Sequence, residues 1–79
     1  MDKFNHYCGI DASKDTIDIK SINAGHKVYS NNLFGFRKLL KESSAGTHFV
    51  MESTGVYHQK LAHFLYNKGY AVSVVNPLI

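Results

Sequence analysis

Apolar and polar residues follow two different periods along the chain, and the changes of period predict five strands and two helices. Short runs that are continuously apolar or alternate with period two are typical of strands. Five such runs lie at residues 6–10, 16–20, 26–32, 47–51 and 71–75. Two other segments place apolar residues three and four positions apart, which favours amphipathic helices. The first contains Phe36, Leu39 and Leu40, and the second runs from residue 56 to 68 with a stripe of Tyr57, Leu61, Phe64 and Leu65.

Residues with capping and turn preferences lie at the ends of the helical segments. Asn31 or Asn32 is a suitable N-cap for the first helix, and the small residues 43–46 are suited to ending it. The second helix follows a turn at residues 53–55, and Lys68 with Gly69 fits its C-terminus. The expected order is therefore β-β-β-α-β-α-β.

This order of elements predicts an α/β fold with a mixed sheet. Short links at residues 12–15 and 24–25 suit antiparallel neighbours, so the first three strands are expected to form a meander. Right-handed crossovers then make the last two strands parallel to the first. The simplest strand order is 3-2-1-4-5, which is the arrangement of the ribonuclease H fold. The fourth strand, uncharged up to Glu52, is expected to be buried on both faces.

Two carboxylates directly follow strands that are predicted to be buried. Asp11 comes after the first strand and Glu52 after the fourth. If these strands are parallel neighbours, about 4.8 Å apart, both side chains emerge at the same carboxyl edge of the sheet, where open α/β sheets usually bind ligands. Oxygen ligands of this kind suit Mg²⁺, which is usually held by one or two carboxylates and keeps several waters. The alternative is that both acids begin solvent-facing turns.

Composition narrows the class of protein without identifying a partner. The chain has 79 residues, enough for one modest core. Its single cysteine, Cys8, cannot form an internal disulfide and is expected to be a small buried hydrophobe in a reduced, cytoplasmic setting. No apolar run is long enough to span a membrane, and no leader is evident. The net charge of +3 comes from scattered lysines and permits nucleic acid as a partner.

Three separate stretches carry a resemblance to a known family. They read G-I-D-A-S-K-D-T-I-D-I from Gly9, F-V-M-E-S-T-G-V-Y-H from Phe49, and V-S-V-V-N-P from Val72. In this order and spacing they resemble the start of the DEDD transposases of the insertion-sequence one-ten family. The match covers essentially the whole chain, although the region between Asn23 and His48 matches only loosely.

The resemblance implies a RuvC-like nuclease domain that cleaves and joins DNA with Mg²⁺ or Mn²⁺. Asp11 and Glu52 match the first two acids of the DEDD set, and both are expected to be catalytic metal ligands. The other two acids are expected further downstream in the family, so residues 1–79 are interpreted as the N-terminal portion of the nuclease domain, inactive alone. The resemblance also implies DNA as substrate, a structured guide RNA for the full-length protein, and a homo-oligomer acting at the prokaryotic nucleoid.

Four residues near the two acids are candidates for contact with nucleic acid. Ser13 and Lys14 follow the first acid and are placed to meet a phosphate, although a solvated turn explains them equally well. Thr54 and Gly55 lie at the expected start of the second helix, where backbone amides favour anions; ordinary capping is the alternative. Tyr57 is expected in the core. Asp18 alternates with isoleucines, is expected to face away from the core, and is left out of the site.

A different class of function also fits the sequence. The chain could be a non-catalytic small α/β module that binds nucleic acid or associates with itself, with both acids as ordinary surface residues. A truncated sheet that lacks its final helix would leave an apolar face exposed, and such patches favour dimerisation. The five histidines have no spacing typical of a zinc site, so they do not change this choice.

Overall fold

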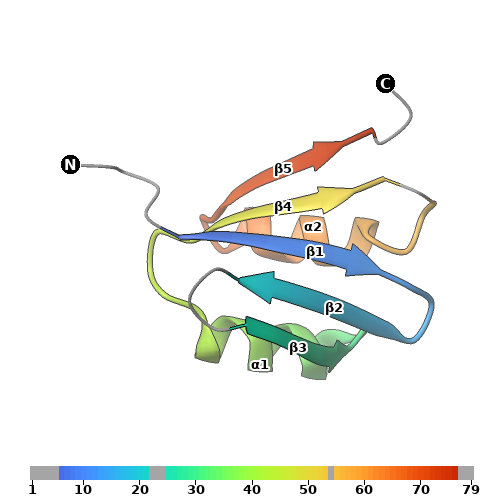
Figure 1. Cartoon of the computed structure of the whole chain (residues 1–79), viewed down its shortest axis with the longest axis horizontal. Helices are drawn as coiled ribbons and strands as arrows, with labels where there is room; N and C mark the ends of the chain where they lie inside the picture. The colour runs from blue at the N-terminus through green and yellow to red at the C-terminus, as the bar shows by residue number, and fades with distance from the viewer. Residues whose placement is uncertain (1–5, 22–24, 54, 77–79) are drawn as a thin grey trace.

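A computed structural model describes residues 6–21, 25–53 and 55–76, and its elements follow the predicted order (Figure 1). The elements are β1 (Tyr7–Ala12), β2 (Thr16–Ser21), β3 (Gly25–Ser30), α1 (Leu33–Glu42), β4 (His48–Glu52), α2 (Gln59–Asn67) and β5 (Ala71–Val75). Thr54 lies outside the described residues.

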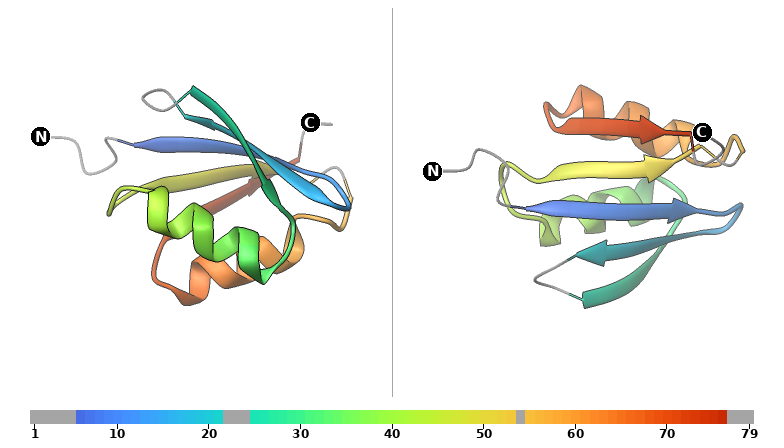
Figure 2. Two further views of the ribbon diagram at one scale, coloured as in Figure 1. Left: turned by 90° about the horizontal axis from the view of Figure 1, so that it is seen from below. Right: turned by 45° about the horizontal axis from the view of Figure 1, so that its top comes forward.

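The five strands form one mixed sheet with the order β3-β2-β1-β4-β5. The pairs β1–β2 and β2–β3 are antiparallel, whereas β1–β4 and β4–β5 are parallel. This confirms the predicted meander, the two crossovers and the strand order 3-2-1-4-5. It is the arrangement of a ribonuclease H-like fold, and it puts the carboxyl ends of β1, β4 and β5 at the same edge of the sheet (Figures 1 and 2).

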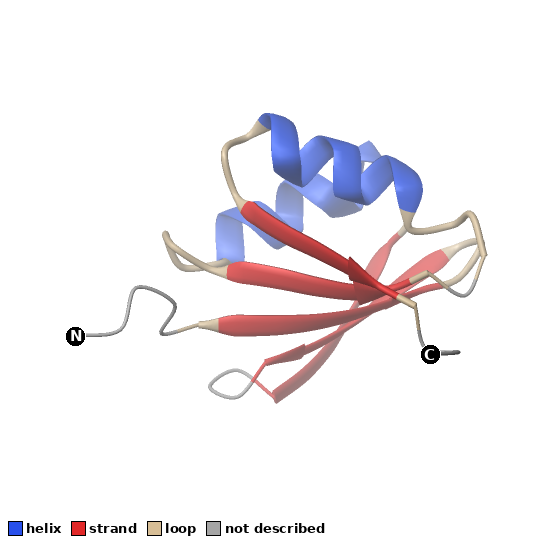
Figure 3. Ribbon diagram, turned by 90° about the horizontal axis from the view of Figure 1, so that it is seen from above, coloured by secondary structure: helices blue, strands red, loops and turns tan. Residues whose placement is uncertain are grey.

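Both helices lie on one face of the sheet (Figure 3). The side chains that alternate toward the helices form the core, together with those of the helices themselves. The rings of Phe36 and Phe64 contact each other in a tilted arrangement, with centroids 5.5 Å apart. The core comprises Cys8, Ile10, Ile17, Ile19, Tyr29, Phe36, Leu39, Phe49, Met51, Leu61 and Leu65. We call the other face, on which no described element packs, the open face.

The open face overturns one prediction about β4. This strand was expected to be buried on both faces, yet only Phe49 and Met51 are buried. His48 and Val50 are half-buried and Glu52 is exposed, because they alternate onto the open face. An uncharged run is therefore compatible with one covered face as well as with two.

Two asparagines in the link between β3 and α1 were both candidates for the N-cap of α1, and the structure gives them different roles. Asn32 is the cap, and its side-chain Oδ1 accepts a hydrogen bond of 2.9 Å from the Gly35 amide. The predicted strand extended to Asn32, but β3 ends at Ser30 because Asn31 and Asn32 have other hydrogen-bonding roles. Asn31 instead contacts two other loops, as described below.

The start of α2 differs from the prediction. The helix begins at Gln59 rather than Val56, because the preceding residues form a turn in which the Gln59 amide donates to the Val56 carbonyl over 3.2 Å. Tyr57 lies in this turn and is 48% exposed, so its expected place in the core was wrong. The helix ends as predicted, with Lys68 as C-cap and Gly69 at a φ of 89°. Neither helix of the described chain has the length and apolar character needed to cross a membrane.

Candidate functional site

The fold brings Asp11 and Glu52 to one place on the open face. Asp11 is the penultimate residue of β1 and Glu52 is the last of β4, so each lies within its strand rather than after it. The preceding residues, Ile10 and Met51, are partners in the parallel register and point into the core. Alternation then turns both carboxylates toward solvent. Both line a groove of about 330 Å³.

A third carboxylate, Asp18 of β2, lines the same groove. It is the antiparallel partner of Asp11, and residues directly opposite in such a pair have Cβ atoms about 4.5–5.5 Å apart. Asp18 faces away from the core, as predicted, but its place in the site was not predicted. The signal was present: a hairpin that turns at residues 13–16 pairs positions 11 and 18, and alternation alone does not show this pairing.

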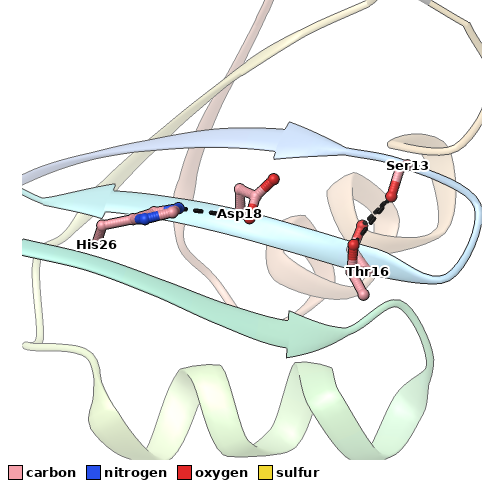
Figure 4. Close-up of polar contacts among 4 residues, drawn as sticks. All are labelled: Ser13, Thr16, Asp18 and His26. Carbon is pink, nitrogen blue, oxygen red and sulfur yellow. Dashed lines mark hydrogen bonds and ion pairs between the residues drawn. The ribbon is translucent and has the colours of Figure 1, made fainter.

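We call this groove, lined by Gly9, Ile10, Asp11, Asp18, Lys20, Val50, Glu52 and Val75, the acidic groove. Three carboxylates against one ammonium give it an excess of negative charge, which favours a cation. His26 lies 3.4 Å from an oxygen of Asp18 and restrains that side chain from the β3 side (Figure 4).

The donor set suits an ion that keeps most of its water. Within the described parts of the chain, no three His, Cys, Asp or Glu side chains come close enough to hold a metal by themselves. Asp11 and Glu52 offer hard oxygen donors from adjacent strands, which suits Mg²⁺ held by two carboxylates and several waters. A tightly enclosed metal cage would need more ligands than these residues supply.

The candidates for nucleic-acid contact have different surroundings. Ser13 is engaged within the β1–β2 turn, where its Oγ lies 3.1 Å from the carbonyl oxygen and 3.0 Å from the Oγ1 of Thr16 (Figure 4). Lys14 is exposed and lines a second groove. Thr54 is not among the described residues. Gly55 is exposed in the turn before α2, so its expected position at the helix N-terminus was wrong.

The described residues with clearly shifted pKa values, Cys8, Tyr29 and Glu42, lie away from the acidic groove. They line a cavity of about 150 Å³ near the start of β1. Cys8 is buried, as predicted, and its burial raises the pKa of the thiol to about 11. The Tyr29 hydroxyl donates a 2.5 Å hydrogen bond to Glu42, and burial followed by this bond raises the pKa of Tyr29 to about 12. The same hydrogen bond, with help from Lys27, lowers the pKa of Glu42.

Comparison with known proteins gives one family and two similar relatives. The family model for DEDD transposases of IS110, described as a transposase, matches residues 8–79. The relatives are pilin gene-inverting proteins of Moraxella lacunata and Moraxella bovis, each 35% identical over 81 residues. These alignments cover 91% of this chain but 25% of each relative, so the chain spans about a quarter of their length. Asp11 and Glu52 both fall inside the matched range.

Proposed function

The chain belongs to the DEDD transposases of the IS110 family, and from this premise we propose that residues 1–79 are the N-terminal portion of a nuclease domain. The domain cleaves and joins DNA phosphodiesters with the help of a divalent metal. The further acids of the DEDD set lie in another part of the whole protein, so these residues alone are inactive. The observation that carries the proposal is that Asp11 and Glu52 line the same groove.

In this proposal Asp11 and Glu52 hold an Mg²⁺ or Mn²⁺ ion between β1 and β4. When bound, such an ion polarises a scissile phosphate and activates the attacking oxygen. The chain's own part is to hold the two carboxylates in place, and Ile10 and Met51 do so because their buried side chains anchor the strand ends. Asp18 adds negative charge beside Asp11 without having to contact the ion.

The partners proposed for the whole protein follow from its family. DNA is the substrate, a structured guide RNA selects the target, and the protein acts as a homo-oligomer at the nucleoid in a prokaryotic cytoplasm. Ser13, Lys14, Thr54 and Gly55 stay candidates for contact with nucleic acid, and Lys14 is exposed and lines the second groove.

The metal site is tested by titrating the isotope-labelled chain with Mn²⁺ and recording amide spectra. Paramagnetic broadening is expected first at Asp11, Ala12 and Glu52, because these amides surround the proposed ion. Mg²⁺ in excess should reverse the broadening. Asp11→Asn combined with Glu52→Gln should abolish it.

Asp15→Asn is the matched control, since Asp15 is an exposed acid in the same hairpin that does not line the acidic groove. It should leave the broadening unchanged. Broadening that survives in the Asp11→Asn/Glu52→Gln variant, or that is lost equally in the control, contradicts the proposed site.

A self-associating, non-catalytic module is the second candidate function, and the open face favours it. Tyr7, Val28 and Val75 are between 43% and 55% exposed, and all three alternate onto this face. Sedimentation equilibrium on the wild type and on Val28→Lys separates the two. A stable dimer that this substitution dissociates, without any Mn²⁺ effect at Asp11 or Glu52, would favour the module.

A further inference from the structure

A second groove, of about 390 Å³, lies among the loops at the carboxyl ends of β1 and β4. The β1–β2 turn, the β3–α1 link and the segment that leads into α2 all contribute to it. We call it the lysine groove, and its lining residues are Lys14, Asn31, Val56, Tyr57, Gln59 and Lys60. The β1–β2 and β4–α2 connections lie at the same end of the sheet (Figure 1), which is also the end that carries Asp11 and Glu52.

One side chain ties the two walls of the lysine groove together. The Asn31 Nδ2 donates to the Ser13 carbonyl over 2.7 Å and to the Tyr57 carbonyl over 3.0 Å. The Asn31 backbone amide also donates to the Asp15 carbonyl over 2.9 Å. These bonds hold the turn that carries Lys14 against the segment that carries Tyr57, so the groove is formed before any ligand binds.

The groove has the chemistry of a site for a nucleic-acid strand. Lys14 and Lys60 are exposed, no acidic residue lines the groove, and within the described residues neither lysine forms an ion pair. Lysine ammonium groups bind phosphates as point charges. Tyr57, which is 48% exposed, lines the same groove, and exposed aromatic rings serve as platforms for unpaired bases.

We infer that the lysine groove binds a single strand of DNA, with phosphates on Lys14 and Lys60 and a base stacked on Tyr57. Asn31 is a positioning residue that keeps the two lysine-bearing segments together. The inference rests on the proposed function in one respect: DNA is the strand, and it continues from the lysine groove to the acidic groove. A duplex would keep its bases stacked on one another and leave the Tyr57 ring without a partner.

The test measures binding of fluorescein-labelled oligothymidylate to the 79-residue chain by anisotropy, in EDTA and over a range of salt concentrations. Wild-type binding should weaken as salt rises. Lys14→Gln with Lys60→Gln should lower the slope of log affinity against log salt by about 1.4, at about 0.7 per phosphate contact on a single strand. Lys38→Gln with Lys41→Gln removes the same charge from exposed positions on α1 and should leave the slope nearly unchanged.

The stacking contact has its own matched pair of variants. Tyr57→Ala should weaken binding about tenfold, whereas Tyr57→Phe should bind as the wild type does, because stacking needs the ring and not the hydroxyl. Tyr66→Ala removes a tyrosine that is 73% exposed on α2, away from the lysine groove, and should have no effect. Amide shifts caused by the oligonucleotide should centre on Lys14, Tyr57 and Lys60.

Several outcomes would overturn the inference. These are no binding at low salt, equal losses from both lysine pairs, an unchanged affinity for Tyr57→Ala, or at least tenfold tighter binding of the matching oligouridylate, which would make RNA the occupant. Because EDTA removes metal, the result is independent of the Mn²⁺ titration. Binding without a metal effect contradicts only the catalytic proposal, and a metal effect without binding contradicts only the lysine groove.

Discussion

Gly35→Ala gives the sharpest test of how α1 docks on the sheet. A Cβ atom added at Gly35 would lie 1.9 Å from the carbonyl oxygen of Ser30, 2.7 Å from its carbonyl carbon and 2.9 Å from its nitrogen. Cβ atoms essentially never approach other atoms within 3.0 Å, so the end of β3 and the start of α1 must separate by about 1 Å. The obstacle is backbone, and no side-chain rotation relieves it.

The magnitude follows from two opposing effects. Alanine is favoured over glycine by up to about 1 kcal/mol in a helix interior. Overpacking costs about 1–3 kcal/mol and occasionally more, and a backbone clash at three atoms puts this site at the upper end. We therefore expect the free energy of unfolding to fall by about 2 kcal/mol. For a chain of this size, with a total stability of about 4–12 kcal/mol at about 0.05–0.15 kcal/mol per residue, the variant stays mostly folded.

Urea denaturation followed by far-UV circular dichroism measures this loss. With a slope of about 1 kcal/mol per molar urea for a small domain, the midpoint should fall by about 2 M. Gly55→Ala is the control, because a Cβ there meets nothing within 4 Å and its φ is not positive, and its midpoint should change little. A Gly35→Ala midpoint at or above that of the wild type would refute the close approach of α1 to β3.

Three further outcomes are expected from the core and from the perturbed groups. Leu61→Ala leaves a cavity at a fully buried position and should lower the free energy of unfolding by about 2–5 kcal/mol. Calorimetry should show a melting temperature lower by at least about 8 °C. A smaller drop would mean that α2 packs loosely. Cys8, whose pKa rises from 9.0 to about 11, should carry about 100-fold less thiolate and react correspondingly slowly with iodoacetamide until urea unfolds the chain; rapid labelling of the folded chain would contradict its burial. The Tyr29 hydrogen bond lowers the pKa of Glu42 in the folded state. The wild type should therefore be more stable than Tyr29→Phe above pH 4.5, the ordinary pKa of Glu42, and this difference in stability should decline as the pH falls below 4.5. A difference that grows in acid would contradict the lowered pKa.

Local pattern predicted most of the elements because hydrophobic period and capping chemistry are properties of short segments. Asn32 as a cap and Gly69 after α2 are examples in which one residue's hydrogen bond or φ ends an element. Prediction failed where a segment's spacing was ambiguous. Tyr57 lies four positions before Leu61 and continues the helical stripe on paper, but the turn at residues 55–58 rotates its ring into solvent.

Half of the candidate site was open to sequence reasoning, because Asp11 and Glu52 lie at the ends of strands that the pattern makes parallel neighbours. Asp18 could also have been found, because the register of the β1–β2 hairpin places it opposite Asp11. The lysine groove could not, since it depends on contacts between loops far apart in the chain. The hydrogen bonds of Asn31 to Ser13 and Tyr57 join three such loops, and no local pattern encodes their meeting.

Hydrophobic periodicity along these residues accounts for the order of elements, the mixed sheet and the two acids at one sheet edge. Those features follow from alternation, helical spacing and the handedness of crossovers, which act over short stretches of chain. Packing decided which face of the sheet is covered, which side chains share a groove, and that the acidic groove and the lysine groove lie at the same end of the sheet. These features depend on distances between segments that are far apart in the sequence, and only the tertiary contacts determine such distances. The two grooves that result carry the chemistry proposed for this domain.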